Sequence, residues 1–283
     1  MCRLYGFLAT EDTRLDCSLV QAQNALLVQS DRDLRGMRSP DGWGIAQWHS
    51  ELPTVTKNTH PAFADRQFVD VASAMTSRAV IAHVRTATVG KVSIENTHPF
   101  DHGPWVFAHN GTIGGIEHVG TRLDIGLYGP TFGETDSELV FRWILNRMST
   151  YGLSPDSPAH DLEPILSLVE DSLSELIRFG IEAGVEQRPS LNFILSDGRH
   201  MVASRWGNSL HWTFRRGVSD CVFCRSSHCE HADEAYRAVV IASEPITNEP
   251  WLEIPEGSLV GVGTTLATVS RSLVSEHTVP IEL

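Results

Sequence analysis

Cysteine at position 2 is the first residue of this chain that suggests chemistry. If Met1 is removed, Cys2 carries both a thiol and the α-amino group of the chain. A thiol becomes a strong nucleophile when a base takes its proton, and an α-amine with a pKa of about 8 can act as that base. A second-position cysteine is weak evidence by itself, so other parts of the chain must agree with it.

Two further motifs each lie at the end of an expected strand. The first, IAHVRTATVG (81–90), is an apolar run that ends on Arg85, which could hold a carboxylate bidentately or form a surface ion pair. The second, WVFAHNGTI (105–113), runs into Asn110 and Gly111. Asn-Gly is first of all a turn dipeptide, but its side-chain amide and backbone N–H could also form an oxyanion hole.

The fourth motif, GETDSELVFRW (133–143), predicts the start of a helix. Thr135 and Glu138 fit a capping box, which places Asp136 in the first turn, where the helix dipole favours a carboxylate. The same position would fix the Asp136 carboxylate for holding a substrate ammonium group. Together the four motifs predict a site for an α-amino acid that is attacked at its side-chain carbonyl.

In this order the motifs resemble those of class II glutamine amidotransferases, which are N-terminal nucleophile hydrolases. The matching pieces are Cys2, R-T-A-T at 85–88, H-N-G at 109–111, T-D-S-E at 135–138 and S-E-P at 243–245. The resemblance runs from residue 2 to about residue 263, nearly the whole chain. We therefore expect a single class II glutamine amidotransferase domain over residues 2–283.

The resemblance also implies a role for each matching residue. Cys2 would be the nucleophile, with its own amine as the base, and Asn110 with Gly111 would form the oxyanion hole. The substrate-binding residues that it implies are Arg85 for the glutamyl carboxylate, Thr88 nearby, and Asp136 for the glutamyl amine.

Two departures from the family pattern bear on the reaction. No synthase domain follows the glutaminase-like part, and Thr86 stands where sugar-amidating relatives have Trp. The chain is more similar to stand-alone members, such as the ergothioneine-pathway γ-glutamyl amidohydrolase and the amidotransferase-like subunit that degrades glutathione. We expect a cysteine-dependent amidohydrolase that cleaves glutamine or a larger γ-glutamyl compound through a γ-glutamyl thioester on Cys2. The alternative is an ammonia-donating or non-catalytic subunit that acts only with a synthase partner.

The apolar runs predict strands, then helices, then strands again. Expected strands are 4–9, 43–48, 79–86, 105–109, 191–196, 200–206, 209–215, 236–242 and 258–263. Expected helices are 17–28, 63–75, 136–148 and 164–179. This segregation indicates α+β layers, and the resemblance implies a four-layer αββα sandwich.

The composition excludes several classes of partner. The net charge of −13 is spread over the chain, whereas binding to nucleic acid or to an anionic membrane needs a clustered positive field. No signal peptide is evident and no apolar run reaches the length of about 20 residues that spans a bilayer. We expect a soluble, cytoplasmic protein that acts on a small γ-glutamyl molecule, with a synthase or a second copy of the chain as the possible partner.

The five cysteines are an odd number without a secretion signal, so a disulfide framework is not expected. The stretch CVFCRSSHCEH (221–231) has the ligand types of a structural zinc site, namely Cys221, Cys224, Cys229 and His231, with His228 beside them. Ligands this close in sequence must wrap one ion tightly. We therefore expect a reduced, partly exposed loop with no metal and no cofactor, and keep structural zinc as the alternative.

Three other features are expected to be structural. His83 and His109 lie on apolar strands and should be core histidines whose hydrogen bonds are satisfied. The stretch SPDGWG (39–44) is a glycine-bearing turn that enters a strand, and we expect it to serve packing with no catalytic role.

Overall fold

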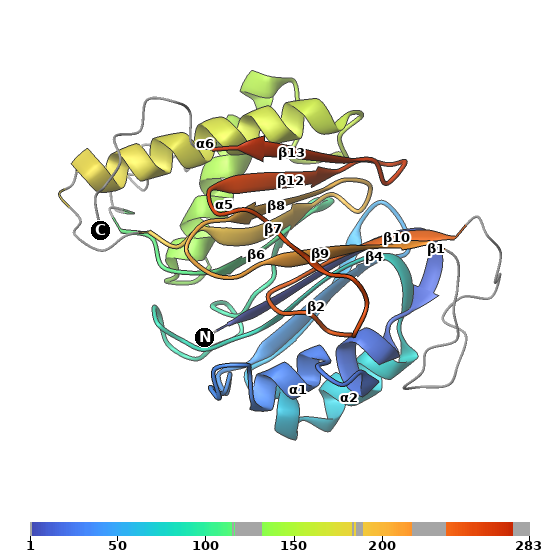
Figure 1. Cartoon of the computed structure of the whole chain (residues 1–283). Coiled ribbons are helices and arrows are strands. Elements are labelled where there is room, and N and C mark those ends of the chain that lie inside the picture. Colours follow the sequence, from blue (N-terminus) through green and yellow to red (C-terminus); the bar gives the residue numbers. More distant parts are fainter. Residues whose placement is uncertain are drawn as a thin grey trace.

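Two antiparallel sheets lie face to face, and helices cover the outer side of each (Figure 1). The computed structural model describes residues 2–114, 116, 132–182, 184, 189–216 and 236–273. In Figure 1, α5 and α6 lie over the upper sheet, while α1 and α2 lie beneath the lower one. The expected four-layer αββα sandwich is confirmed.

The lower sheet has seven strands in the order β11-β9-β10-β1-β4-β2-β3. Its strands are β1 (Arg3–Arg14), β2 (Trp43–Trp48), β3 (Pro53–Asn58), β4 (Thr76–Val84), β9 (His211–Arg216), β10 (Arg237–Ala242) and β11 (Leu252–Glu253). β1 lies between β4 and β10, so the first strand of the chain is in the middle of the sheet. The N-terminal end of β1 is therefore held by neighbouring strands on both sides.

The upper sheet has six strands in the order β13-β12-β8-β7-β6-β5. Its strands are β5 (Phe100–His102), β6 (Trp105–Asn110), β7 (Asn192–Ser196), β8 (Met201–Arg205), β12 (Ser258–Val262) and β13 (Thr268–Ser272). Between the sheets lies an apolar layer in which β1 contributes Leu4 and Leu8 and β6 contributes Val106 and Ala108. Because side chains alternate along a strand, the alternate residues of the two strands, such as Phe107 of β6, face the helices.

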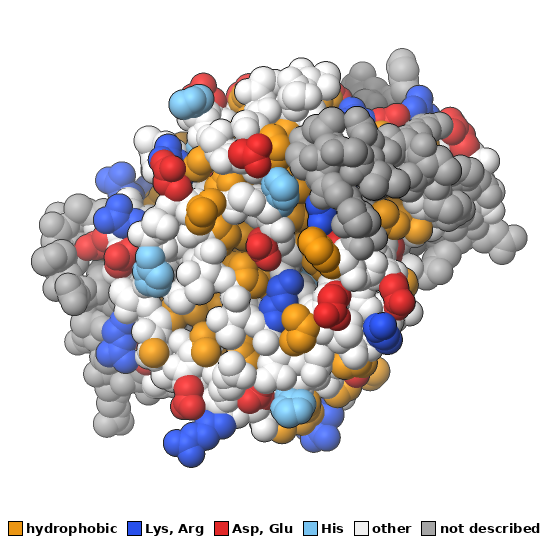
Figure 2. Space-filling view, turned by 180° about the vertical axis from the view of Figure 1, so that it is seen from behind, with side chains coloured by type: hydrophobic (Ala, Val, Ile, Leu, Met, Phe, Trp, Pro, Cys, Tyr) orange, Lys and Arg blue, Asp and Glu red, His pale blue; other side chains and the backbone are white. Residues whose placement is uncertain are grey.

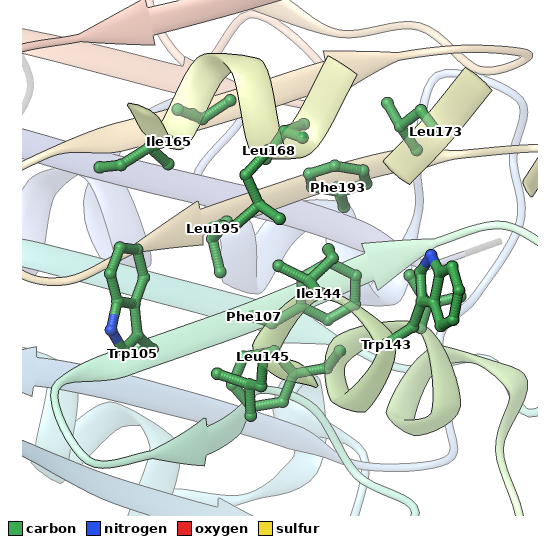
Figure 3. Close-up of a cluster of buried hydrophobic side chains, with 14 of the residues drawn as sticks. Trp105, Phe107, Trp143, Ile144, Leu145, Ile165, Leu168, Leu173, Phe193 and Leu195 are labelled. Carbon is green, nitrogen blue, oxygen red and sulfur yellow. The ribbon is translucent and has the colours of Figure 1, made fainter. Parts of the chain in front are cut away.

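The helices bury an apolar face on each sheet. α1 (Leu26–Asp31) and α2 (Arg66–Ala74) cover the lower sheet, and α5 (Asp136–Arg147) and α6 (Leu162–Glu182) cover the upper one. Figure 3 shows Phe107 and Phe193 of the sheet packed with Ile144 of α5 and Leu168 and Leu173 of α6. Each such buried side chain contributes roughly 1.5–3 kcal/mol of transfer free energy, so this layer holds α5 in a fixed position over β6.

The helix expected over 17–28 is wrong in its middle. The chain forms a π-helical turn over Cys17–Gln21, then a turn over residues 22–25, and then α1. Asn24 explains the break, because its backbone N–H donates to the Ile246 carbonyl oxygen at 3.2 Å and its side-chain amide donates to the Pro245 carbonyl oxygen at 2.8 Å. These contacts to a distant segment replace the intrahelical hydrogen bonds.

Several short elements have no counterpart in the sequence prediction, namely β3, β5, β11 and β13. All four are edge strands of the two sheets. Edge strands are partly exposed, so their apolar signal is weak.

In the described residues no helix is long and apolar enough to cross a membrane. Figure 2 shows acidic and basic side chains interspersed on the face that it displays, with apolar side chains between them.

Candidate active site

Cys2 lies directly before β1, and its thiol rests against the chain that leaves β4. The backbone N–H of Thr86 donates to Cys2 Sγ at 3.2 Å, and the thiol donates to the Thr86 carbonyl oxygen at 3.4 Å. Burial raises the pKa of the Cys2 thiol, while the Thr86 N–H, Arg85 and Arg3 oppose that rise. The thiol is therefore protonated at neutral pH, and a nucleophilic role requires a base.

A buried ion cluster holds the start of β1. The Arg3 guanidinium contacts the Asp33 carboxylate and, at 3.0 Å, the Glu244 carboxylate. It also donates to the Cys2 carbonyl oxygen at 2.9 Å. The side chains of Arg3, Asp33 and Glu244 are only 4%, 1% and 5% exposed. Ser243 adds a hydroxyl that accepts a hydrogen bond from the β1 backbone at 2.9 Å. The placement of Cys2 thus depends on charges that the protein has removed from water.

The backbone around Arg85 is fixed by the turn that precedes β2. The Arg85 N–H donates to the Gly42 carbonyl oxygen at 2.8 Å, and the Arg85 carbonyl oxygen accepts from the Asp41 N–H at 3.0 Å. The Asp41 carboxylate accepts from the Ala87 N–H at 2.8 Å. The stretch 39–44, which we expected only to pack, therefore also positions the arginine segment.

The Arg85 side chain points into the loop that follows it. Nη1 donates to the Lys91 carbonyl oxygen at 3.2 Å and Nη2 donates to the Val89 carbonyl oxygen at 3.1 Å. The residue is 2% exposed, and no described carboxylate lies within 4.0 Å of its guanidinium. No described carboxylate therefore forms a direct ion pair with it, although Asp41 is near enough to act on its charge. Thr88 is exposed on the same loop.

Asn110 and Gly111 end β6. Asn110 is 4% exposed, and its carbonyl oxygen accepts from the Asn208 side chain at 3.2 Å. It falls on the same face of β6 as Ala108, the face that looks toward the other sheet. A Cβ at Gly111 would lie 2.0 Å from the Ser190 carbonyl oxygen, so only glycine fits there. This close approach, rather than a hairpin turn, explains the glycine.

Asp136 is the first residue of α5, as predicted. Its carboxylate accepts from the Ile113 N–H at 2.9 Å and from the Ser137 N–H at 2.8 Å, which ties the segment after Gly111 to the helix. The Thr135 hydroxyl accepts from the Glu138 N–H at 3.2 Å, so the N-cap is confirmed.

The reciprocal half of the expected capping box is wrong. The Glu138 carboxylate accepts instead from the N–H groups of Phe132 and Gly133, at 2.8 and 2.7 Å. It therefore fixes the segment that enters α5 rather than the N-cap backbone.

The two strand histidines differ in their surroundings. His109 Nδ1 lies 2.8 Å from the Ser137 hydroxyl and Nε2 lies 2.9 Å from the Ser190 carbonyl oxygen, so its hydrogen bonds are satisfied as predicted. His83 has no hydrogen-bond partner among the described residues and packs on His98 at 4.4 Å between ring centroids. The prediction for His83 was therefore wrong. Burial, together with the nearby Arg85 and His109, lowers its pKa to about 3.

These contacts bring most of the predicted residues to one end of the sandwich. Cys2 meets the Arg85 segment on the lower sheet, and Asp136 meets the segment after Gly111 on the upper one. β1 and β4 contact β6 across the sandwich. His83 lies near both Arg85 and His109, whose charges help to lower its pKa. The thiol, the guanidinium, the amide and the carboxylate thus lie at the start of β1, after β4, at the end of β6 and at the start of α5, while Thr88 lies on the exposed loop.

Sequence reasoning did not identify Arg3, Asp33 or Asp41 as supports of this site. A signal for Arg3 existed, because a charged residue that opens a buried central strand needs a buried partner. Asp33 and Asp41 gave no such signal. The possible zinc ligands Cys221, Cys224, Cys229 and His231 lie outside the described residues, as do Met1 and His228. The described residues contain no group of three or more His, Cys, Asp or Glu placed to hold a metal ion.

Comparison with known proteins relates this geometry to a family. A family model described as "Glutamine amidotransferases class-II" matches residues 1–279. The chain is 33% identical over 232 residues to the "Putative glutamine amidotransferase YafJ" of Escherichia coli (strain K12), across 77% of this chain and 82% of that protein.

Two further relatives match along almost the whole length. The "Gamma-glutamyl-hercynylcysteine sulfoxide hydrolase" of Mycobacterium tuberculosis (strain ATCC 25618 / H37Rv) is 27% identical over 281 residues, which cover 96% of this chain and 98% of that protein. A solved glutamine aminotransferase class-II domain protein from Silicibacter pomeroyi superposes with a TM-score of 0.61 at 18% identity, covering 95% of this chain and 97% of that one. The structural likeness supports the fold alone.

Proposed function

Because the chain belongs to the class II glutamine amidotransferase family and is an enzyme of the amidohydrolase type, we propose that it cleaves a γ-glutamyl amide with Cys2 as the nucleophile. The observation that carries the proposal is the position of the thiol. Cys2 Sγ lies 3.2 Å from the Thr86 N–H, directly beside Arg85, a buried arginine without a described carboxylate partner. A substrate carboxylate that met Arg85 would bring the rest of a glutamyl group close to the sulfur.

The first half of the proposed reaction forms a thioester. After removal of Met1, the α-amine of Cys2 takes the thiol proton, and Sγ attacks the γ-carbonyl carbon of the substrate. The side-chain amide of Asn110 and the N–H of Gly111 stabilise the resulting oxyanion. When the tetrahedral intermediate collapses, the C–N bond breaks and the ammonium of Cys2 returns the proton to the leaving amine.

The second half releases glutamate. Water attacks the γ-glutamyl thioester, the α-amine accepts a proton from that water, and the C–S bond breaks to regenerate the Cys2 thiol. Through both halves Arg85 holds the glutamyl carboxylate and Asp136 holds the glutamyl ammonium. The raised pKa of the thiol agrees with this scheme, because a protonated thiol needs an adjacent base.

The proposed substrate carries an amine larger than ammonia. The mycobacterial relative, named a gamma-glutamyl-hercynylcysteine sulfoxide hydrolase, matches this chain along 96% of its length. Binding energy from a larger leaving group would raise kcat/KM above the value for glutamine.

The test measures glutamate release from glutamine and from a panel of γ-glutamyl peptides and amines. Cys2→Ala should abolish turnover, whereas Cys17→Ala, which removes the other described thiol from the core beneath the lower sheet, should keep it. Intact mass should show that the active protein lacks Met1. Wild-type turnover by Cys2→Ala, or equal activity of protein that retains Met1, would contradict the mechanism.

Two further outcomes test the oxyanion hole and the substrate class. Asn110→Ala should lower kcat by about 10²–10³ if its amide stabilises the oxyanion. If glutamine proves to be the best substrate, or if activity appears only after a synthase is added, the chain is an ammonia-donating subunit instead.

A further inference from the structure

A cavity separate from the candidate active site, here called the edge-strand cavity, lies between two edge strands of the two sheets, β3 and β5. Its volume is about 270 Å³, and none of the predicted site residues lines it. Its described walls come from both edge strands, from the loop after β4 and from α5; they are Lys57, Ile94, Glu95, Phe100, Asp101, Phe132, Glu138, Phe141 and Arg142. The volume is just below the range of about 300–1,000 Å³ found for most ligand pockets, and it suits a molecule the size of one amino acid.

Lys57 supplies a cation that is not paired by the described protein. Its side chain is partly buried, and its ammonium lies 5.3 Å from the centroid of the Phe100 ring. No described carboxylate lies within 4.0 Å of it. The sequence has only two lysines, Lys57 and Lys91, against twenty arginines. Burial lowers the pKa of Lys57, while Asp101, Glu138 and Glu95 oppose the change. These three carboxylates therefore face the ammonium across the cavity without direct contact.

The carboxylates of the cavity differ in what they already bind. Glu138 accepts two backbone N–H groups and lies 3.7 Å from the Arg142 guanidinium, so its charge is engaged. Glu95 and Asp101 are exposed at the rim, and neither forms an ion pair with a described residue. The cavity thus offers an ammonium on one side and two rim carboxylates on another.

The remaining walls are apolar, formed by Ile94 and by three aromatic rings. Phe132, the first described residue after the gap at 117–131, is 81% exposed, and the Arg142 guanidinium lies 5.6 Å from the centroid of its ring. A covering ligand would bury part of this ring and of Ile94, which is 46% exposed. Apolar walls together with opposite charges at separate points complement a zwitterion with an apolar side chain.

We propose that this cavity binds a free α-amino acid with an apolar side chain, at a site separate from Cys2. The ligand carboxylate pairs with Lys57, its ammonium pairs with Glu95 or Asp101, and its side chain packs on the aromatic rings.

A ligand in the cavity would contact two segments that also support the proposed glutamyl site. Ile94 and Glu95 belong to the loop whose Val89 and Lys91 carbonyl oxygens hold the Arg85 guanidinium. The same loop is tied to the start of α5, because the Asn96 side chain donates to the Lys91 carbonyl oxygen at 3.0 Å and accepts from the Glu134 N–H at 2.7 Å.

The helix provides the second connection, since α5 begins with Asp136 and carries three wall residues. The amino acid would therefore change the affinity for the glutamyl substrate, and the substrate would change the affinity for the amino acid by the same factor. This coupling rests on the proposed function, whereas binding to the cavity does not.

The test of binding uses titration calorimetry with L-phenylalanine and L-leucine on the Cys2→Ala protein, in which no turnover is expected. We expect saturable binding of one molecule per chain. Lys57→Met keeps the aliphatic stem and removes the charge, so it should weaken binding by roughly tenfold to a hundredfold, the loss expected for a charge-assisted hydrogen bond. Lys91→Met changes an exposed lysine on the loop that carries Ile94 and Glu95, and this variant should bind as the parent does. The probes 3-phenylpropionate and phenethylamine, which lack the amine and the carboxylate respectively, should each bind more weakly.

A second readout uses the rarity of lysine. Acetylation followed by mass spectrometry reports Lys57 and Lys91 separately, and their ratio cancels any consumption of reagent by the amino acid. Filling the cavity should lower labelling at Lys57 relative to Lys91.

Three results would overturn the proposal. They are absence of saturable binding by either amino acid, unchanged binding in Lys57→Met, and loss of binding in Arg85→Ala without loss in Lys57→Met. The last result would place the amino acid in the glutamyl site. Failure of the proposed function is seen separately, as glutamate release that does not depend on Cys2.

Discussion

Replacing Arg3 by Met should destabilise the protein strongly, because Arg3 pairs two carboxylates that water cannot reach. The side chains of Asp33 and Glu244 are 1% and 5% exposed, and both contact the Arg3 guanidinium. Methionine fills most of the volume of the arginine stem, so the change removes the charge with little loss of packing. Removing one partner of a buried ion pair leaves an uncompensated charge and costs roughly 3–5 kcal/mol. We expect a loss of this size in the free energy of unfolding.

The matched control is Arg14→Met on the same strand. The Arg14 side chain is 50% exposed and lies 3.2 Å from the Asp16 carboxylate. A partly exposed ion pair of this kind contributes about 0–1 kcal/mol, so the same substitution should have a small effect. Urea unfolding of both variants and of the parent protein, followed by circular dichroism, gives the two differences directly.

The ion cluster also predicts non-additivity. Glu244→Gln in the Arg3→Met background should recover part of the loss, because it removes one of the two unpaired carboxylates. A loss below about 1 kcal/mol in Arg3→Met, no larger than that of a surface ion pair, would refute the reasoning that this cluster is buried and tightly coupled.

Three other predictions follow from single contacts. Gly111→Ala should lose about 1–3 kcal/mol of stability together with activity, because its Cβ would lie 2.0 Å from the Ser190 carbonyl oxygen. Gly180→Ala in α6, whose Cβ would have no described neighbour closer than 3.7 Å, should instead gain roughly 0.5–1 kcal/mol in urea unfolding; the opposite order would contradict the geometry. In protein that retains Met1, alkylation of Cys2 by iodoacetamide, followed by peptide mass spectrometry, should show a midpoint above the free-cysteine pKa of about 8.5, since burial raises the pKa of the thiol. A midpoint below that value would contradict the raised pKa. Burial lowers the pKa of His83 to about 3 from an unfolded value near 6.5, so protonation favours the unfolded chain, and stability that is complete above pH 6.5 is lost as the pH falls toward 3. In urea unfolding measured across that pH range, His83→Phe should reduce this loss of stability, whereas the exposed control His49→Gln should not. An equal dependence of stability on pH in the parent and both variants would show that His83 does not titrate as stated.

The sequence alone predicts the elements whose signals are local. The strand expected over 43–48 is observed over the same residues, because five of the six positions are buried and a continuous apolar run bounded by turns records that burial directly. The N-cap at Thr135 was likewise predictable, since a hydroxyl placed before a helix serves the free N–H groups of its own first turn. The order of the short motifs was enough to indicate the family, and with it the four-layer arrangement.

Features that depend on residues far apart in the chain become evident only in the tertiary structure. Asn24 ends the first helical turn because it bonds to residues 245 and 246, which no local pattern could indicate. Arginine is a residue type usually found on the surface. Arg3 is buried beside Cys2 because the folded chain places Asp33 and Glu244, from two other segments, in contact with its guanidinium.

The same limit applies to the edge-strand cavity. Lys57 reads as an exposed lysine in a weakly apolar stretch, and its partial burial becomes visible only once the edge strands of two separate sheets meet. Local sequence records the preferences of the backbone and the burial of its own side chains, whereas charge pairing and cavities between sheets arise from long-range packing. The sequence therefore predicts which residues could carry the chemistry, whereas most of the contacts that support them become evident only in the folded chain.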